Sequence, residues 1–395
     1  MLSRLHYRDH IHHFANREML EMFSFQVLRE LAFGLVGIFV PVYLYTHGVS
    51  LFHILALFTL QSTLHGLVAF LVGRSVLLKI GLKHSFVLAN FLFIASFITI
   101  QQGVALSHLL LWALFNGSAN AIYASSFHSY LTLTIDDRSA GKEMGWLAIG
   151  VIMIDVITPF VGATCILLFG FSNMFAIGSL FVLASAIPLF FSSEVDISNQ
   201  IHLKGTSHLK EFWRSKKKIA WSTVGAGFDG SSNPLWDSLY LFKLLGSIEF
   251  LGLLTSVVSF FQIISNYIGG KRLDENRSGF NIGISGSIFA RMLTFASFHP
   301  YVAILSESLN YAIRPLFSTA YGATFYKQMR GPITVSMVVA HESIWHIANV
   351  FALCVITAGT YFFGWYAFLI TGVFMIIGKL IIRAQRVGAP ETLPV

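Results

Sequence analysis

The sequence predicts an all-α membrane protein with twelve transmembrane helices, and three observations support this fold class. Apolar residues make up 55% and charged residues 11% of the 395 residues, whereas soluble domains average about 25% charged residues. Long apolar segments recur along the chain, each close to the roughly 20 residues that one membrane crossing needs. Finally, most Lys and Arg fall in the two tails or in every second connection.

The apolar segments alternate with polar connections along the whole chain. In order, they run over residues 19–46, 50–73, 84–102, 104–132, 144–169, 171–192, 218–244, 247–269, 280–298, 300–326, 332–357 and 361–384. We predict a helix for each segment, because backbone that faces lipid must satisfy its own hydrogen bonds. Connections on one side are short, such as 46–50 and 169–173, whereas those on the other side, such as 73–85 and 136–143, are more basic.

The basic connections predict the orientation of the chain in the cytoplasmic membrane. Cytoplasmic loops retain Lys and Arg, so we expect both termini in the cytoplasm and an even number of crossings. Residues 1–18 are polar and basic, and no small-residue cleavage site follows them, which indicates a retained tail. The same bias explains the net charge of +7. We therefore expect contact with membrane lipid and none with nucleic acid.

The longest polar stretch lies in the middle of the chain and predicts two domains. It separates an N-terminal six-helix bundle with a short cytoplasmic tail from a C-terminal six-helix bundle with its own tail. The bundles and the central cytoplasmic loop are residues 1–192, 218–395 and 193–217, respectively. IFVPVYLY at 38–45 is similar to LWDSLYLF at 235–242, at corresponding helices of the two bundles. Such matches are typical of parallel repeats, so we predict two pseudo-symmetric bundles.

Motifs in the connections add a resemblance to a known family. GRSVLLKIGLKH follows the second segment, with leucine where that family has aspartate, and GGKRLDENR is a second copy after the eighth. Together with the six-plus-six pattern, they make the chain resemble the major facilitator superfamily over essentially its whole length. The resemblance implies a monomer whose helices 1, 4, 7 and 10 surround a central cavity. It also implies a cytoplasmic gating motif at Gly73, Lys79, Gly81, Gly270 and Asp274.

Ionisable side chains inside apolar segments point most directly to function. Each costs about 2.5–3.5 kcal/mol at a helix centre, so such residues usually face the protein interior and find partners. Among Asp, Glu and Arg, nine lie there: Arg29, Glu30, Asp155, Asp229, Asp237, Arg291, Glu307, Arg314 and Glu342. Carboxylates outnumber arginines, and burial favours the protonated carboxyl group, so we expect proton exchange at one or more of them. Ion pairs that only join helices are the alternative, and we assign that role to Asp155 and Arg291.

The seventh segment combines carboxylates with helix breakers. Asp229, Asn233 and Asp237 are spaced by four residues, which predicts that they share one helix face. Pro234 removes a backbone donor within the same stretch. Interrupted helices flanked by charges are how transporters build substrate and ion sites, although a proline kink between closely packed helices would leave the same pattern.

The tenth and first segments supply further candidates. Glu307, Asn310 and Arg314 share a face by their spacing. Arg314 either holds an anionic substrate group or pairs with a carboxylate of the seventh or tenth segment. Arg29 and Glu30 are adjacent, so their side chains point about 100° apart and cannot both face a central cavity squarely.

The fourth and eleventh segments carry amides and histidines. Asn116 and Asn120 form a polar stripe that suits hydroxyl-rich or zwitterionic solutes or, equally, hydrogen bonds between helices. His128 lies off that stripe. Glu342 belongs to HESIWH at 341–346, where the histidines are five residues apart, unlike the H-E-x-x-H zinc motif. We therefore predict no metal site and no cofactor.

These features favour a secondary active transporter, not an enzyme, that moves a small solute of unknown identity with protons. A P-loop motif is absent from the sequence, which argues against a primary pump. Pro159 and Gly162 retain part of a glycine-proline motif associated with antiporters in the resembled family, a slight indication of export. Two alternatives stay open: transport of a metal ion or metal chelate, and a membrane sensor or accessory subunit that transports nothing.

Overall fold

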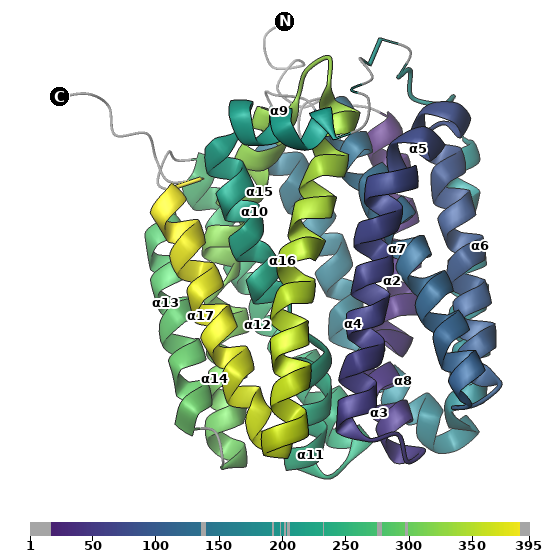
Figure 1. The fold of residues 1–395 in the computed structure, drawn as a ribbon, viewed down its shortest axis with the longest axis vertical. Helices are drawn as coiled ribbons and strands as arrows, with labels where there is room; N and C mark the ends of the chain where they lie inside the picture. Colours follow the sequence, from purple (N-terminus) through teal and green to yellow (C-terminus); the bar gives the residue numbers. More distant parts are fainter. Residues whose placement is uncertain are drawn as a thin grey trace, which may run out of the picture.

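The computed structural model describes residues 17–135, 140–191, 193–197, 199–200, 203, 206–231, 233–274, 279–296 and 299–387, and these residues form a bundle of helices (Figure 1). We call residues 17–191 the first half and residues 217–387 the second half. The first half contains α2 (Arg17–Val36), η1 (Gly37–Phe39), α3 (Val40–Thr46), α4 (Leu51–Val68), η2 (Ala69–Gly73), α5 (Arg74–Ile80), α6 (Leu82–Gln101), α7 (Leu106–Thr134), α8 (Ala140–Ser185) and η3 (Ile187–Phe190).

The short helix α9 (Ser207–Ser215) lies between the halves in sequence and at one end of the bundle in space. The second half contains α10 (Lys217–Gly230), η4 (Asn233–Tyr240), α11 (Leu241–Leu245), α12 (Ile248–Asp274), α13 (Phe280–Met292), η5 (Leu293–Ala296), α14 (Pro300–Ile313), α15 (Pro315–Met329), α16 (Thr334–Phe363), η6 (Gly364–Ala367) and α17 (Phe368–Gln385). Among these, η2 and η4 are π-helical.

Helices occupy each of the predicted ranges, and the described residues contain no strand. Helix α8 covers two predicted segments and turns at Gly170, whose φ of 80° is readily adopted only by glycine. By length and composition, six helical spans in the described part of the chain are suited to cross a membrane: Arg17–Thr46, Leu51–Leu71, Leu82–Gln101, Glu143–Phe190, Ile248–Gly269 and Thr334–Gln385. The predictions of twelve crossings, cytoplasmic termini and the three-part domain division stay predictions.

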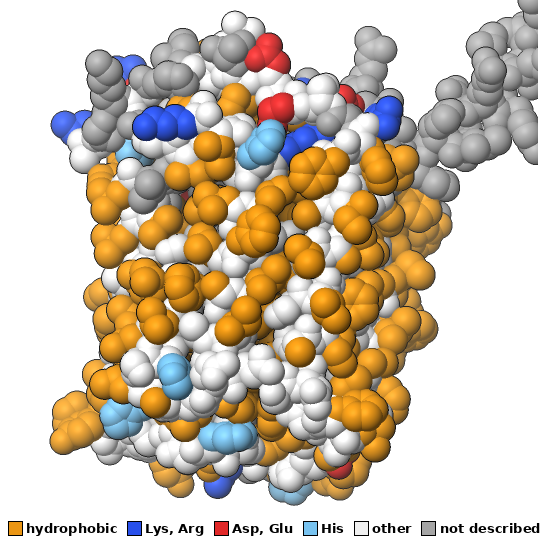
Figure 2. All heavy atoms as spheres, turned by 90° about the vertical axis from the view of Figure 1, so that its right-hand side faces the viewer, with side chains coloured by type: hydrophobic (Ala, Val, Ile, Leu, Met, Phe, Trp, Pro, Cys, Tyr) orange, Lys and Arg blue, Asp and Glu red, His pale blue; other side chains and the backbone are white. Residues whose placement is uncertain are grey.

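The outer surface matches a lipid environment. Figure 2 shows, on one face, a belt of hydrophobic side chains between two more polar rims, with Lys and Arg mostly on the rim near α9. Large apolar side chains are exposed on several helices, among them Leu168, Leu180 and Ile347. A continuous apolar surface of this kind is unfavourable in water. The protein is therefore an integral, multi-pass membrane protein.

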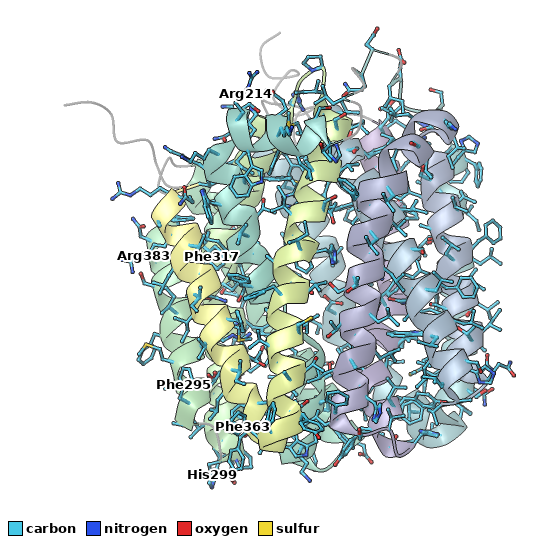
Figure 3. The ribbon with its side chains drawn as sticks, viewed as in Figure 1. Arg214, Phe295, His299, Phe317, Phe363 and Arg383 are labelled. Carbon is cyan, nitrogen blue, oxygen red and sulfur yellow. The ribbon has the colours of Figure 1, made fainter. Side chains whose placement is uncertain are left out.

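The two halves touch at both ends of the bundle. Near α9, Arg330 follows the end of α15. Its Nε donates a hydrogen bond to the carbonyl oxygen of Thr132, at 3.0 Å. At the opposite end, where α3 and α11 lie, the Tyr45 and Trp365 rings meet edge to face with centroids 5.5 Å apart. Figure 3 labels Arg214 at the α9 end, and Phe363 and His299 near the other end. Between these contacts the halves enclose a central space.

Candidate functional site

A cavity of about 740 Å³ lies between the two halves. Its wall includes residues of α2, α4, α7 and α8 from the first half and of α10, η4, α12, α14 and α16 from the second. The acidic and histidine residues of the lining are Glu30, Asp155, Asp237, Glu342, His65, His128, His341 and His346. The described lining residues include no Lys or Arg. Polar groups that converge in a cavity of this size are typical of ligand-binding sites.

On the first-half side, Glu30 of α2 and Asp155 of α8 form a carboxyl pair. Their side chains lie within hydrogen-bonding reach of each other, and a hydrogen bond between them requires a proton on one of the two groups because an ionised carboxylate can only accept. The two helices come close at Gly34, where a Cβ atom would collide with the Thr158 side chain. Asp155, which we assigned a structural role from the sequence, thus lies in the cavity wall.

Arg29 faces away from the cavity, as its 100° offset from Glu30 predicts. Its guanidinium carbon lies 3.5 Å from the ring centroid of Tyr123, 4.0 Å from that of Phe33 and 5.0 Å from that of Phe93. Stacking on several rings stabilises a buried cation through the negative potential of the ring faces. The structure therefore places Arg29 inside the first half, where it holds α2 against α6 and α7.

The second half contains two groups of ion pairs. Asp229 on α10 pairs with buried Lys379 on α17, and Arg314 Nη2 lies 3.8 Å from Asp229 Oδ2. Arg291 Nη1 lies 2.6 Å from Glu307 Oε2, and Arg291 Nη2 lies 3.9 Å from Asp237 Oδ1. These pairs join α10, η4, α13, α14 and α17, which is the cross-linking role expected as the alternative to a transport role.

The shared face predicted for the seventh segment is not found for its two carboxylates. Asp229 is directed at α17, whereas Asp237 lines the cavity. The helix is interrupted between them, because α10 ends at Gly230 and the π-helical stretch η4, which contains Pro234, begins only at Asn233. The two carboxylates therefore do not lie on one continuous α-helix. The side chain of Asn233 lies outside the described residues.

The tenth-segment candidates also lie away from the cavity. Glu307 is buried against Arg291, and Asn310 accepts a hydrogen bond from Ser287 Oγ at 3.2 Å. Arg314, with 49% of its side chain exposed, ends α14 beside Asp229. The residue of α14 that lines the cavity is Tyr311. The ion-pair interpretation of Arg314 thus has a partner in the structure.

The amide stripe of the fourth segment reaches the cavity and continues onto α4. Asn120, in the cavity wall, donates from Nδ2 to Asn116 Oδ1 at 2.9 Å. Gln61 Nε2 donates to the same oxygen at 3.2 Å. Three amides on two helices therefore form one network, with Asn120 and Gln61 facing the cavity.

Histidines from both halves surround Glu342. The Nε2 atoms of His65, His128 and His341 lie 3.4, 3.5 and 3.9 Å from its carboxylate oxygens. His128, predicted to lie off the polar stripe of α7, reaches the cavity from the α9 side, and its Nδ1 hydrogen-bonds the Tyr326 hydroxyl at 2.7 Å. This cluster joins α4 and α7 of the first half to α16 of the second.

The predicted gating motif lies outside the cavity, around α5. Gly81 has a φ of 88°, and a Cβ atom there would come within 2.6 Å of Glu194 Oε2. The Glu194 carboxylate accepts hydrogen bonds from the backbone N–H groups of Leu82 and Lys83, each at 3.0 Å, at the start of α6. Lys79 is exposed. The side chains of the second copy, Gly270 and Asp274, lie outside the described residues, and Gly73 ends the π-helical η2.

Comparison with known proteins identifies the family. The model of the Major Facilitator Superfamily matches residues 22–230, more than half of the 395 residues. The chain belongs to the major facilitator superfamily. No curated protein matches the sequence.

Solved structures show the same fold at low sequence identity. The chain is similar to a D-xylose-proton symporter, with 15% identity, a TM-score of 0.67 and coverage of 95% of this chain and 98% of the other. It is also similar to the human organic anion transporter MFSD10, with 14% identity, a TM-score of 0.65 and coverage of 93% and 99%. A third is the E. coli fucose:proton symporter FucP, with 12% identity, a TM-score of 0.63 and coverage of 93% and 98%.

In this member of the superfamily, two ionisable residues of the central region escaped the sequence analysis. His65 lies in an apolar stretch of α4 and Lys379 in an apolar stretch of α17. A lone Lys within IIGKLII is a detectable signal, because an unpaired charge there would be expensive. A lone His is not, because histidine is tolerated more readily and nothing nearby in the sequence indicates its partners.

Proposed function

We propose that the protein is a secondary active transporter that moves a small solute across the cytoplasmic membrane by alternating access, coupled to protons. The observation that supports this most is the cavity between the halves, with contacts between the halves flanking it at both ends. Rocking of one half against the other would break one set of contacts and keep the other, which opens the cavity to one side at a time.

The proposed proton site is the carboxyl pair of Glu30 and Asp155. A single proton lets the two groups share a hydrogen bond between α2 and α8. Loss of that proton places two negative charges side by side in a poorly solvated position, which is unfavourable. The separation of α2 and α8 is thereby linked to protonation. Two of the three similar structures described above are proton symporters.

The charges of the wall favour a neutral or cationic solute. Four carboxyl groups and four histidines line the cavity, with no Lys or Arg among the described lining residues. Arg314, the one candidate for an anionic group, lies beside Asp229 and outside the wall. Asn120 and Gln61 offer amide groups to hydroxyl-bearing solutes. As to direction, the partial antiporter motif at Pro159 and Gly162 favours export.

Proton-coupled flux can be measured with protein reconstituted in liposomes that contain a pH-sensitive dye. D-xylose and L-fucose serve as neutral probes and a small organic amine as the cationic probe. A probe that is carried should move protons in wild type, and the variant with Glu30→Gln and Asp155→Asn should lose this proton movement. Glu249→Gln, at an exposed site on α12, is the matched control. Probe flux without proton movement in wild type would contradict the coupling.

A further inference from the structure

We propose that His65, Glu342 and His346 bind a divalent transition-metal ion, with Zn²⁺ as the best match, in the wall of the cavity. The three residues are 6%, 5% and 6% exposed. One ligand atom from each lies within 4.8 Å of those of the other two. Glu342 and His346 are one turn apart on α16, and His65 reaches them from α4 in the other half.

The spacing of the ligand atoms is close to that of a zinc site. Zn–N and Zn–O bonds of about 2.0–2.1 Å in a tetrahedron separate the ligand atoms by about 3.4 Å. His65 Nε2 and Glu342 Oε2 are 3.4 Å apart. The His65 and His346 rings stack with centroids 3.5 Å apart and an interplanar angle of 29°. To bind one ion, the two stacked rings would have to part and turn until their nitrogen lone pairs converge on it.

A chain of hydrogen bonds to His346 Nδ1 fixes the tautomer that can bind a metal ion. Asn349 donates from Nδ2 to the Gly227 carbonyl oxygen at 3.2 Å, so its Oδ1 accepts the Ser62 hydroxyl at 2.7 Å. Ser62 Oγ has then used its proton and accepts from His346 Nδ1, 2.9 Å away. The lone pair of His346 is therefore on Nε2. Outer partners that fix the tautomer in this way are typical of metal-binding histidines.

The groups around Glu342 favour a bound cation. The ion pairs described for this buried carboxylate all involve histidines. His341 donates from Nδ1 to Thr223, whose hydroxyl proton is given to a backbone carbonyl, so a lone pair on His341 Nε2 faces the carboxylate. His65 Nε2 lies 3.4 Å from Glu342 Oε2, where it either donates a proton to the carboxylate or presents a lone pair to a cation that both groups share. The lone pair of His341 Nε2 repels the carboxylate unless a metal ion or a proton lies between them.

The ligand set favours a transition metal over Mg²⁺ or Ca²⁺. Two imidazoles and one carboxylate are a common zinc set, and imidazole also suits Cu, Ni and Fe, whereas Mg²⁺ and Ca²⁺ prefer oxygen ligands throughout. All three residues line the cavity, so the remaining coordination position is open to water or to a solute. Since the ligands come from α4 and α16, a bound ion would also join the two halves.

The test uses the full-length protein, purified in detergent through a tag without histidine and stripped of metal with a chelator. Titration calorimetry at pH 7.5 should find one Zn²⁺ bound per chain, and Zn²⁺ but not Mg²⁺ should raise the melting temperature. Co²⁺ should give visible absorption bands of a low-coordinate site. His65→Ala and His346→Ala should each weaken Zn²⁺ binding at least tenfold. His53→Ala, at an exposed histidine on the same helix as His65, should bind like wild type.

Two results would overturn the metal site. The first is a wild-type protein that binds no Zn²⁺ at micromolar concentrations, which would leave a proton as the cation at Glu342. The second is binding that His65→Ala and His346→Ala leave unchanged. Because the first result needs no variant, a misfolded mutant cannot hide it. Neither measurement involves solute flux, so the metal site and the transport proposal can fail separately.

Discussion

The buried ion pair between Lys379 and Asp229 leads to a quantitative expectation for stability. Lys379 is 0% exposed and Asp229 is 8% exposed, and the pair joins α17 to α10. Lys379→Met leaves the Asp229 carboxylate buried without the Lys379 ammonium group, while half-exposed Arg314 stays 3.8 Å away. Removing one partner of a buried pair usually costs about 3–5 kcal/mol. Because Arg314 stays close, we expect the lower end, about 3 kcal/mol, for Lys379→Met.

The assay is equilibrium unfolding of the detergent-purified variants, which gives a free energy of unfolding for each. Adding Asp229→Asn to Lys379→Met should recover most of the loss, since the buried negative charge is then gone. The exposed Lys210 on α9 provides the control, and Lys210→Met should change stability by less than about 0.5 kcal/mol. The reasoning is refuted if Lys379→Met behaves like Lys210→Met, or if Asp229→Asn deepens the loss.

Three further substitutions test local packing by thermal unfolding. Gly378→Ala should destabilise by about 1–3 kcal/mol, because its Cβ would meet the Gly225 carbonyl of α10, whereas Gly322→Ala, with open space around it, should have little effect; equal effects would contradict this. Arg29→Lys should lower stability by about 1 kcal/mol, since an ammonium group cannot stack on the rings around Arg29; an unchanged melting temperature would argue against the stacking. Gly81→Ala should destabilise by at least about 1 kcal/mol through its positive φ, a loss that Gly322→Ala should not share.

The fold could be predicted because the membrane restricts the possible answers. Segment lengths follow from bilayer thickness, and backbone in lipid must be helical. Hydropathy alone therefore placed helices over every predicted range, even where 144–169 and 171–192 merge in α8 with a turn at Gly170. Family membership followed from the six-plus-six pattern and was confirmed by the family match over residues 22–230.

The candidate site could be predicted only in part, because spacing within one helix does not reveal which helix it faces. The sequence singled out Glu30 and Glu342 as buried charges, and the structure places both in the cavity wall. It did not indicate that Asp155 lies beside Glu30, or that His65 completes a cluster with Glu342. Those contacts join helices far apart in sequence, and they depend on how the helices pack.

Local irregularity caused the clearest discrepancy. The spacing predicts one shared face for Asp229 and Asp237 on a continuous α-helix, but α10 ends at Gly230 and the π-helical η4 begins at Asn233. The rule of four-residue spacing holds within one uninterrupted α-helix, so it fails across such a break. Pro234 indicated an interruption in this stretch, although it could not indicate in which direction the following residues would turn.

The most direct test of the account is whether the cavity opens to each side of the membrane in turn. Cys165 and Cys354 are first replaced, and Thr255, in the cavity wall on α12, is changed to cysteine; Val257→Cys, on the exposed apolar face of the same helix, is the control. A membrane-impermeant thiol reagent is then added to right-side-out or inside-out vesicles. We expect Thr255→Cys to react from both sides and Val257→Cys from neither. Reaction of Thr255→Cys from one side only, or from none, would contradict alternating access.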